Sequence, residues 1–108
     1  MKEQPNLDYL NSLSGGDPDF ERELIKILKE EFPAERDIYY TNLRKSDFQE
    51  TAQIVHKLKH KISILGLEKG YSLAAELEES LKNLTPNDIL LKEFDALLEL
   101  MDSFISGL

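Results

Sequence analysis

The segment His56–Leu67 reads HKLKHKISILGL, and it decides how the rest of the chain is interpreted. Its apolar residues recur at intervals of three and four, which is the period of an amphipathic α-helix. Residues three positions apart are neighbours on one helix face, so the imidazole of His56 and the ammonium of Lys59 are expected side by side. The segment therefore predicts a helix that carries a nucleophile and a cation along one edge.

The helical period continues on the N-terminal side of this segment, and no strand-like alternation persists. A short first helix ending at Ser14–Gly16 is predicted by three leucines at intervals of three, namely Leu7, Leu10 and Leu13. Asp17 and Pro18 predict the N-cap and first residue of a longer helix, which Pro33 is expected to bend. The expected inner face of that helix consists of Phe20, Leu24, Ile27, Leu28 and Phe32.

The helix that carries His56 is expected to begin at the capping-box pattern Ser46–Gln49 and to end at or near Gly66. Two further helices are expected on its C-terminal side. The next helix has an apolar stripe formed by Leu67, Tyr71, Ala74, Leu77, Leu81 and Leu84. After Thr85–Asp88, the last helix is lined by Leu90, Leu91, Phe94, Leu97, Leu98, Met101 and Ile105.

These helices predict an all-α fold in a single domain over residues 1–108. Short joints between amphipathic helices favour antiparallel neighbours, so we expect an up-down-up-down four-helix bundle. A short N-terminal helix would cap the bundle, and one long helix would bend at Pro33. We expect a monomer, because every apolar stripe already has a use inside the bundle.

The composition restricts the possible functions. A net charge of −8, from 13 basic and 21 acidic residues, argues against binding to nucleic acid or to an anionic membrane. There is no cysteine, no apolar run long enough to span a membrane and no apolar segment typical of a secretory signal. The simplest interpretation is a soluble cytoplasmic protein. Three lysines cluster around His56 and His60, where a phosphoryl group could be tolerated: Lys57, Lys59 and Lys61.

Helical-wheel geometry, at about 100° per residue, places His56 on the border between the core and the solvent. His60 lies almost opposite the core. The same border strip contains Ala52, Lys59 and Ser63. A neutral imidazole is a good nucleophile near pH 7, and the small side chains of Ala52 and Ser63 leave room beside it. Lys59 could attract the oxygens of a phosphoryl group.

This pattern resembles the signature of histidine-containing phosphotransfer (HPt) domains, which relay phosphoryl groups in bacterial two-component signalling. The family pattern is a histidine, a lysine three residues later, usually a glycine four later, and a second glycine ten later. His56, Lys59 and Gly66 match it, whereas His60 stands where the first glycine is usual. Residues 8–10, 14–17 and 20 resemble the opening of the family, so the resemblance covers nearly the whole chain.

The resemblance implies that His56 accepts a phosphoryl group from a receiver-domain aspartate, often one fused to a hybrid sensor histidine kinase, and passes it to another receiver. Glu78, twenty-two residues after His56, would accept a hydrogen bond from the imidazole Nδ1–H; otherwise it is a surface carboxylate. The first helix, with Leu10 and Leu13, would help to dock partners. We expect no cofactor and no nucleotide site, and therefore a phosphoryl carrier rather than an autonomous enzyme.

Two alternatives stay open at this point. The chain could be a helical adaptor that binds a signalling partner without covalent chemistry. His60 could narrow the choice of partner, be a neutral surface change, or chelate a metal together with His56, since histidines four residues apart share a helix face. The metal interpretation has only two ligands, so we expect no metal site.

Overall fold

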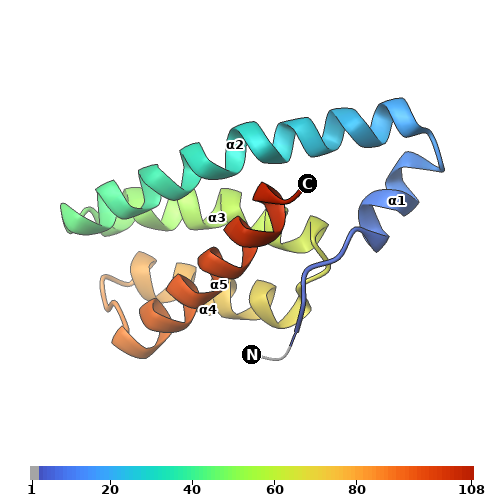
Figure 1. Ribbon diagram of the computed structural model, residues 1–108. Helices are drawn as coiled ribbons and strands as arrows, with labels where there is room; N and C mark the ends of the chain where they lie inside the picture. The colour runs from blue at the N-terminus through green and yellow to red at the C-terminus, as the bar shows by residue number, and fades with distance from the viewer. Residues whose placement is uncertain (1–2) are drawn as a thin grey trace.

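The computed structural model describes residues 3–108, and this part of the chain contains five helices and no strand. They are α1 (Asp8–Ser14), α2 (Pro18–Arg44), α3 (Phe48–Ile64), α4 (Glu68–Lys82) and α5 (Asp88–Ser106) (Figure 1). The all-helical prediction is confirmed.

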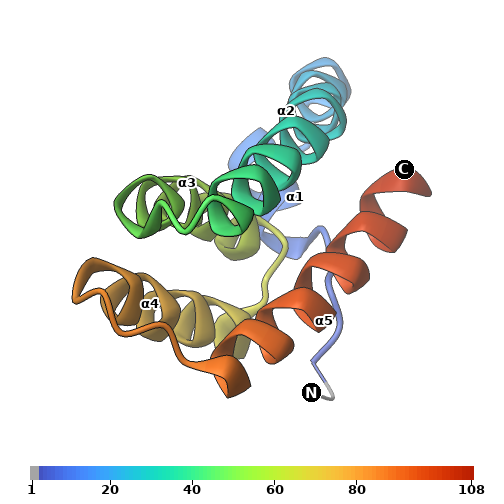
Figure 2. The same ribbon diagram turned by 90° about the vertical axis from the view of Figure 1, so that its left-hand side faces the viewer.

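The four long helices surround one core. α3 packs against both α2 and α4, and α5 packs against α4 and α2. The view in Figure 2 shows these four helices as the corners of the bundle, and the colour gradient in Figure 1 shows that successive long helices run in opposite directions. Polar contacts also tie α2 to α5, because the Tyr40 hydroxyl donates to Asp95 at 2.9 Å and Arg36 pairs with Asp102 at 2.6 Å.

The centre of the bundle is filled by aliphatic and aromatic side chains from α2 to α5. Tyr39 and Phe94 meet edge to face, with ring centroids 5.1 Å apart. Fully buried side chains around them include Phe32, Val55, Leu58, Ile62, Leu77, Leu81 and Met101. Removing such apolar surface from water is the main stabilising contribution to a fold of this kind.

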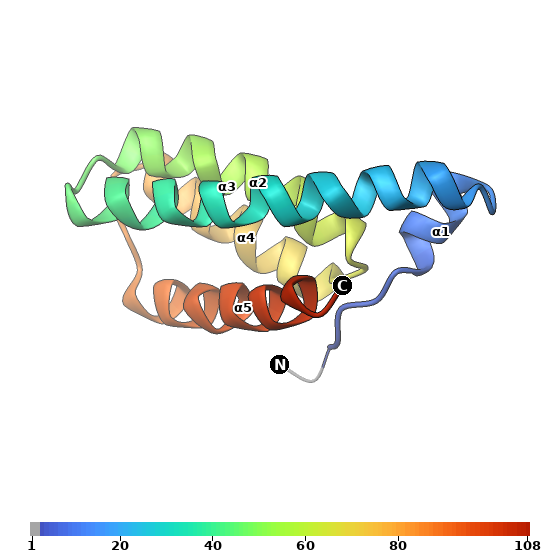
Figure 3. The same ribbon diagram turned by 45° about the horizontal axis from the view of Figure 1, so that its top comes forward.

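α2 is a single helix that continues through Pro33, and the bend expected at this residue stays a prediction. Asp17 caps it as predicted, because its carboxylate accepts the amide of Asp19 at 3.0 Å. The N-terminal end of α2 projects past the other long helices together with α1 (Figure 3). Two residues assigned to its inner face are exposed: Phe20 lies in the first turn of α2, and Ile27 is exposed although its neighbour Leu28 is buried.

Two expectations about helix ends were wrong. The N-cap of α3 is Asp47 rather than Ser46, because Ser46 has a φ of +56° and the Asp47 side chain accepts the amide of Glu50. Leu84 was expected in the apolar stripe of α4. That helix ends at Lys82, and Leu84 lies in the following loop, largely exposed, with a φ of +57°.

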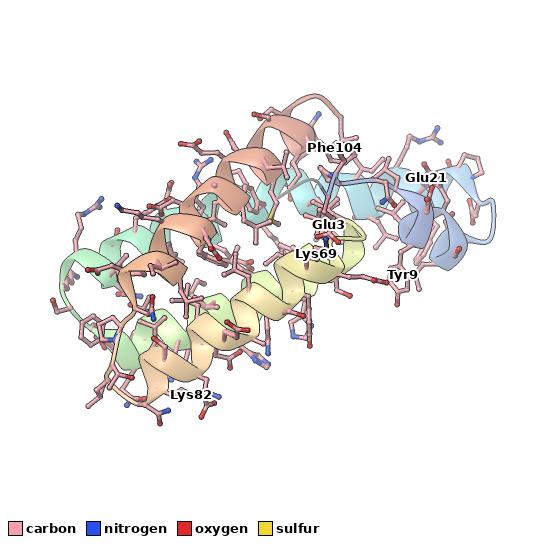
Figure 4. The ribbon with its side chains drawn as sticks, turned by 90° about the horizontal axis from the view of Figure 1, so that it is seen from below. Glu3, Tyr9, Glu21, Lys69, Lys82 and Phe104 are labelled. Atoms are coloured by element: carbon pink, nitrogen blue, oxygen red, sulfur yellow. The ribbon has the colours of Figure 1, made fainter. Side chains whose placement is uncertain are left out.

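The segment before α1 is attached to the turn between α3 and α4. The Glu3 carboxylate accepts the backbone amides of Lys69 and Gly70 at the start of α4 (Figure 4). The backbone amide of Asn6 donates to the backbone carbonyl of Leu65 at 2.9 Å. These bonds place α1 near the C-terminal end of α3. None of the helices within residues 3–108 is long and apolar enough to cross a membrane.

Candidate functional site: a histidine held by a buried carboxylate

His56 lies on the solvent side of α3, and its side chain is 54% exposed. Its neighbours Val55 and Leu58 are fully buried, so the helix places the imidazole at the edge of the core. The Nδ1 atom lies 3.1 Å from Oε2 of Glu78 on α4 and 3.4 Å from Oε1. An ionised carboxylate only accepts hydrogen bonds, so Nδ1 carries a proton, and in the neutral imidazole the lone pair is on Nε2.

Glu78 is a buried carboxylate that binds three nitrogen atoms. Its side chain is only 7% exposed, so it is not the surface carboxylate of the alternative interpretation. Besides His56, it pairs with the Nζ of Lys59 at 2.8 Å and with the Nζ of Lys82 at 3.0 Å. Sequence reasoning missed Lys82, although its spacing of four residues from Glu78 is the usual signal for an ion pair along a helix.

Two opposing effects act on the pKa of Glu78. Burial by itself would raise the pKa, but hydrogen bonds from Lys59 and Lys82, together with their charges, outweigh it and lower the pKa below the ordinary value. Glu78 is therefore ionised at neutral pH. One carboxylate and two ammonium groups leave an excess of one positive charge beside the imidazole, which favours an incoming phosphoryl group.

Lys59 lies one turn after His56, but its amine points to Glu78 rather than into open solvent. The side chain is 13% exposed, and its Nζ lies 5.4 Å from the centroid of the Tyr71 ring. Tyr71 was expected in the core stripe of α4, yet it is 42% exposed and covers this lysine.

A comparison with protein families places this sequence in a known group. The family model described as Hpt domain matches residues 23–105, which include most of α2 and all of the site. The chain belongs to the Hpt domain family. Searches of curated proteins and of solved structures gave no match. Domains of this family carry out histidine phosphotransfer in two-component signalling, as phosphoryl carriers that interact with response-regulator receiver domains and kinases.

Beside the imidazole, this HPt domain has a shallow hollow between α1, α3 and α4. The hollow includes His60, whose ring lies edge to face with that of His56 at 5.3 Å between centroids. The other lining residues are Tyr9, Ser63, Gly66, Leu67, Glu68 and Tyr71. Tyr9 and Tyr71 are both largely exposed, and sequence reasoning had given neither a place at the site.

Two residues expected to contact a partner are buried. Ala52 and Leu10 are 1% and 0% exposed, so neither offers surface to an incoming protein, whereas Leu13 is 48% exposed. The expectation for Ala52 assumed one apolar stripe on α3. Because α3 packs against both α2 and α4, its buried face is wider than that stripe and extends to Ala52.

Lys61 was expected to join the basic cluster at His56, and this was also wrong. Its ammonium pairs with Glu31 at 2.9 Å and Glu35 at 3.2 Å, both on α2. It therefore points away from the imidazole. Within residues 3–108 there is no cluster of three or more histidine or acidic side chains that could hold a metal ion.

Proposed function

We propose that His56 is the residue of this HPt domain that carries the phosphoryl group. It accepts the group from the aspartate of one receiver domain, often part of a hybrid sensor histidine kinase, and passes it to the aspartate of another. The observation that carries the proposal is the orientation of the imidazole. Nδ1 is held by the buried Glu78, which leaves Nε2 as the nucleophile on a ring that is 54% exposed.

On the side of the HPt domain, the transfer balances in atoms and charge with only the imidazole of His56 and the carboxylate of Glu78. The Nε2 lone pair attacks phosphorus, the bond between phosphorus and the aspartyl oxygen breaks, and the receiver regains its carboxylate. The ring, still protonated at Nδ1, gains positive charge as the bond between Nε2 and phosphorus forms, and the ionised Glu78 stabilises that charge. Retaining the Nδ1 proton also makes the imidazole a good leaving group for the second transfer.

Lys59 would supply a cation for the phosphoryl oxygens. Its amine lies 2.8 Å from Oε1 of Glu78, the oxygen that Nδ1 of His56 approaches at 3.4 Å. In this proposal it stays bonded to Glu78 until a phosphate competes for it. Phosphoryl transfer depends mainly on positioning and charge stabilisation, so little else is needed from this side. The receiver would supply the aspartate and its metal ion.

The scaffold that presents His56 is, in this proposal, the antiparallel up-down-up-down bundle of α2 to α5. The docking surface around it would consist of His60, Ser63, Gly66 and Leu13, extended by the two exposed tyrosines of the hollow. His60 and Ser63 lie in the C-terminal half of α3, and Gly66 lies in the turn after it. Tyr71 lies in the first turn of α4, whereas Tyr9 and Leu13 lie on α1.

Labelling from a small phosphoryl donor tests which histidine reacts. Phosphoramidate should give an acid-labile, base-stable label on the wild-type protein and none on His56→Gln. The matched control is His60→Gln, which removes the other histidine of α3 and should leave the label in place. Equal labelling of wild type and His56→Gln would refute the assignment.

A second measurement separates a phosphoryl carrier from a helical adaptor. A phosphorylated receiver incubated with the wild-type protein should lose its label to His56. An adaptor would bind the receiver while the label stays on the aspartate. Binding without transfer, at protein concentrations that saturate the complex, would favour the adaptor.

A further inference from the structure

Lys82 is the last residue of α4 and lies one turn after Glu78, at the far end of α4 from Lys69 (Figure 4). Its Nζ lies 3.0 Å from Oε2 of Glu78. The same oxygen lies 3.1 Å from Nδ1 of His56. Lys82 and His56 therefore share a single acceptor atom, although Lys82 belongs to a different helix.

Lys59 binds the other oxygen of the same carboxylate. Its Nζ lies 2.8 Å from Oε1, so the two ammonium groups hold the two ends of the carboxylate. The two lysines differ in their surroundings, because the Lys59 side chain is 13% exposed and that of Lys82 is 54% exposed. With both oxygens held, the carboxylate has little freedom to rotate, and Oε2 stays beside Nδ1.

We propose that Lys82 is a positioning residue for His56: it holds Oε2 of Glu78 beside the imidazole, so that Nδ1 holds the proton and Nε2 the lone pair. The role matters most after transfer. If the phosphoryl group on Nε2 attracts the Lys59 amine, Glu78 loses one of its two cations and depends on Lys82. The part of the inference that concerns phosphate rests on the proposed function, whereas the orientation of the imidazole does not.

The test compares Lys82→Met with the wild-type domain. Ring-nitrogen NMR should show His56 mainly as the Nδ1–H tautomer in the wild type, with an added fraction of the Nε2–H tautomer in Lys82→Met. Titration of the Glu78 carboxyl carbon should show a higher pKa in the variant, because one of the two cations that oppose the effect of burial is gone. Phosphorylation by phosphoramidate should slow roughly three-fold, the scale of a partly exposed ion pair.

Three variants control this experiment. Lys82→Arg keeps the cation and should restore both the tautomer and the rate. Lys92→Met removes the same charge from an exposed position on α5 and should change neither. In a Glu78→Gln background, Lys82→Met should have no further effect, because a neutral amide does not depend on a neighbouring cation.

An unchanged tautomer and an unchanged Glu78 titration in Lys82→Met would overturn the proposal. The NMR measurements need no phosphate, so they remain decisive even if the phosphoryl label appears on another residue. In that case the proposed function fails while the role of Lys82 in orienting the imidazole is still measured.

Discussion

At the scale of single residues, the Lys59 amine is bound to Glu78 in the structure, whereas the proposed chemistry requires it for phosphate. We expect Lys59→Ala to slow labelling of His56 about ten-fold, because a charge-assisted hydrogen bond to the phosphoryl group is lost. The helical circular dichroism spectrum should be retained. An unchanged labelling rate would remove Lys59 from the mechanism.

Glu78→Gln tests the buried carboxylate through its dependence on pH. The folded protein lowers the pKa of Glu78 from 4.5, so ionised Glu78 stabilises the fold above pH 4.5, and this stabilisation is lost as the pH falls through the folded pKa. We expect Glu78→Gln to lower the free energy of unfolding at pH 7 by about 2 kcal/mol, because the buried end of Lys59 loses its counter-charge.

Urea denaturation at pH 7, 5 and 3 measures this difference. The difference in the free energy of unfolding between wild type and Glu78→Gln should be smaller at pH 3 than at pH 5, because ionised Glu78 stabilises the fold less as the pH falls below 4.5. A gap that stays constant over this range would show that the charge of Glu78 does not contribute to stability.

His60 is the departure from the family pattern, and its ring lies against that of His56. We expect His60→Gly to leave His56 phosphorylatable and to increase the number of receivers that can donate to it, because the bulk beside the reactive ring is removed. The substitution should lower the free energy of unfolding by about 0.4 kcal/mol, since glycine is less favourable than histidine inside a helix. Loss of labelling from phosphoramidate would show that His60 takes part in the chemistry.

At the scale of elements, the turn between α3 and α4 depends on Gly66. Its φ is +74°, and an added Cβ would lie 2.8 Å from the Asn6 side chain. Gly15 provides a matched control, because its φ is +59° and nothing lies within 4 Å of an added Cβ. Gly15→Ala should therefore cost about 1 kcal/mol, the penalty for the backbone conformation alone.

Gly66→Ala should cost more than Gly15→Ala, because the Asn6 side chain must also move. Thermal unfolding of the two variants, followed by circular dichroism, provides the comparison. Equal losses would mean that the segment before α1 adapts freely and does not hold the turn. The same comparison tests how firmly the segment before α1 is attached to the turn, since the backbone amide of Asn6 donates to the Leu65 carbonyl.

Helical periodicity did not predict which residues of the inner face of α2 are buried. The pattern of α2 predicted one continuous inner face, but nothing in a helical wheel tells how far the partner helices extend. Because the start of α2 projects past them, Phe20 is exposed despite its regular spacing. Ile27 is also exposed, although its neighbour Leu28 is buried. The N-cap of α3 lies one residue later than expected for a local reason, since Ser46 has a φ of +56° and the Asp47 side chain accepts the amide of Glu50.

At the scale of the whole molecule, a monomer was expected because every apolar stripe was assigned to the inside of the bundle. Several apolar side chains are exposed, so not every stripe is used inside the bundle: Leu13, Phe20, Ile27, Ile38, Leu84 and Ile89. They lie on α1, α2, the loop before α5 and α5 itself, and scattered apolar residues are normal on a monomer. Sedimentation should therefore give a species of 12.4 kDa. A species of twice that mass at micromolar concentration would contradict this prediction.

The sequence by itself determined what depends on neighbours along the chain. Helical periodicity predicted the helices, Asp17 and Pro18 predicted the start of α2, and three-residue spacing predicted that His56 and Lys59 share an edge of α3. These features follow from local geometry, which a residue pattern encodes directly.

Only the tertiary structure decided which helix each side of α3 meets. That packing buries Glu78 between Lys59 and Lys82, turns Lys61 toward α2 and removes Ala52 from the surface. The physical reason is that a helical wheel gives the direction of a side chain around its own axis, whereas burial and ion pairing depend on the distance and register of the neighbouring helix.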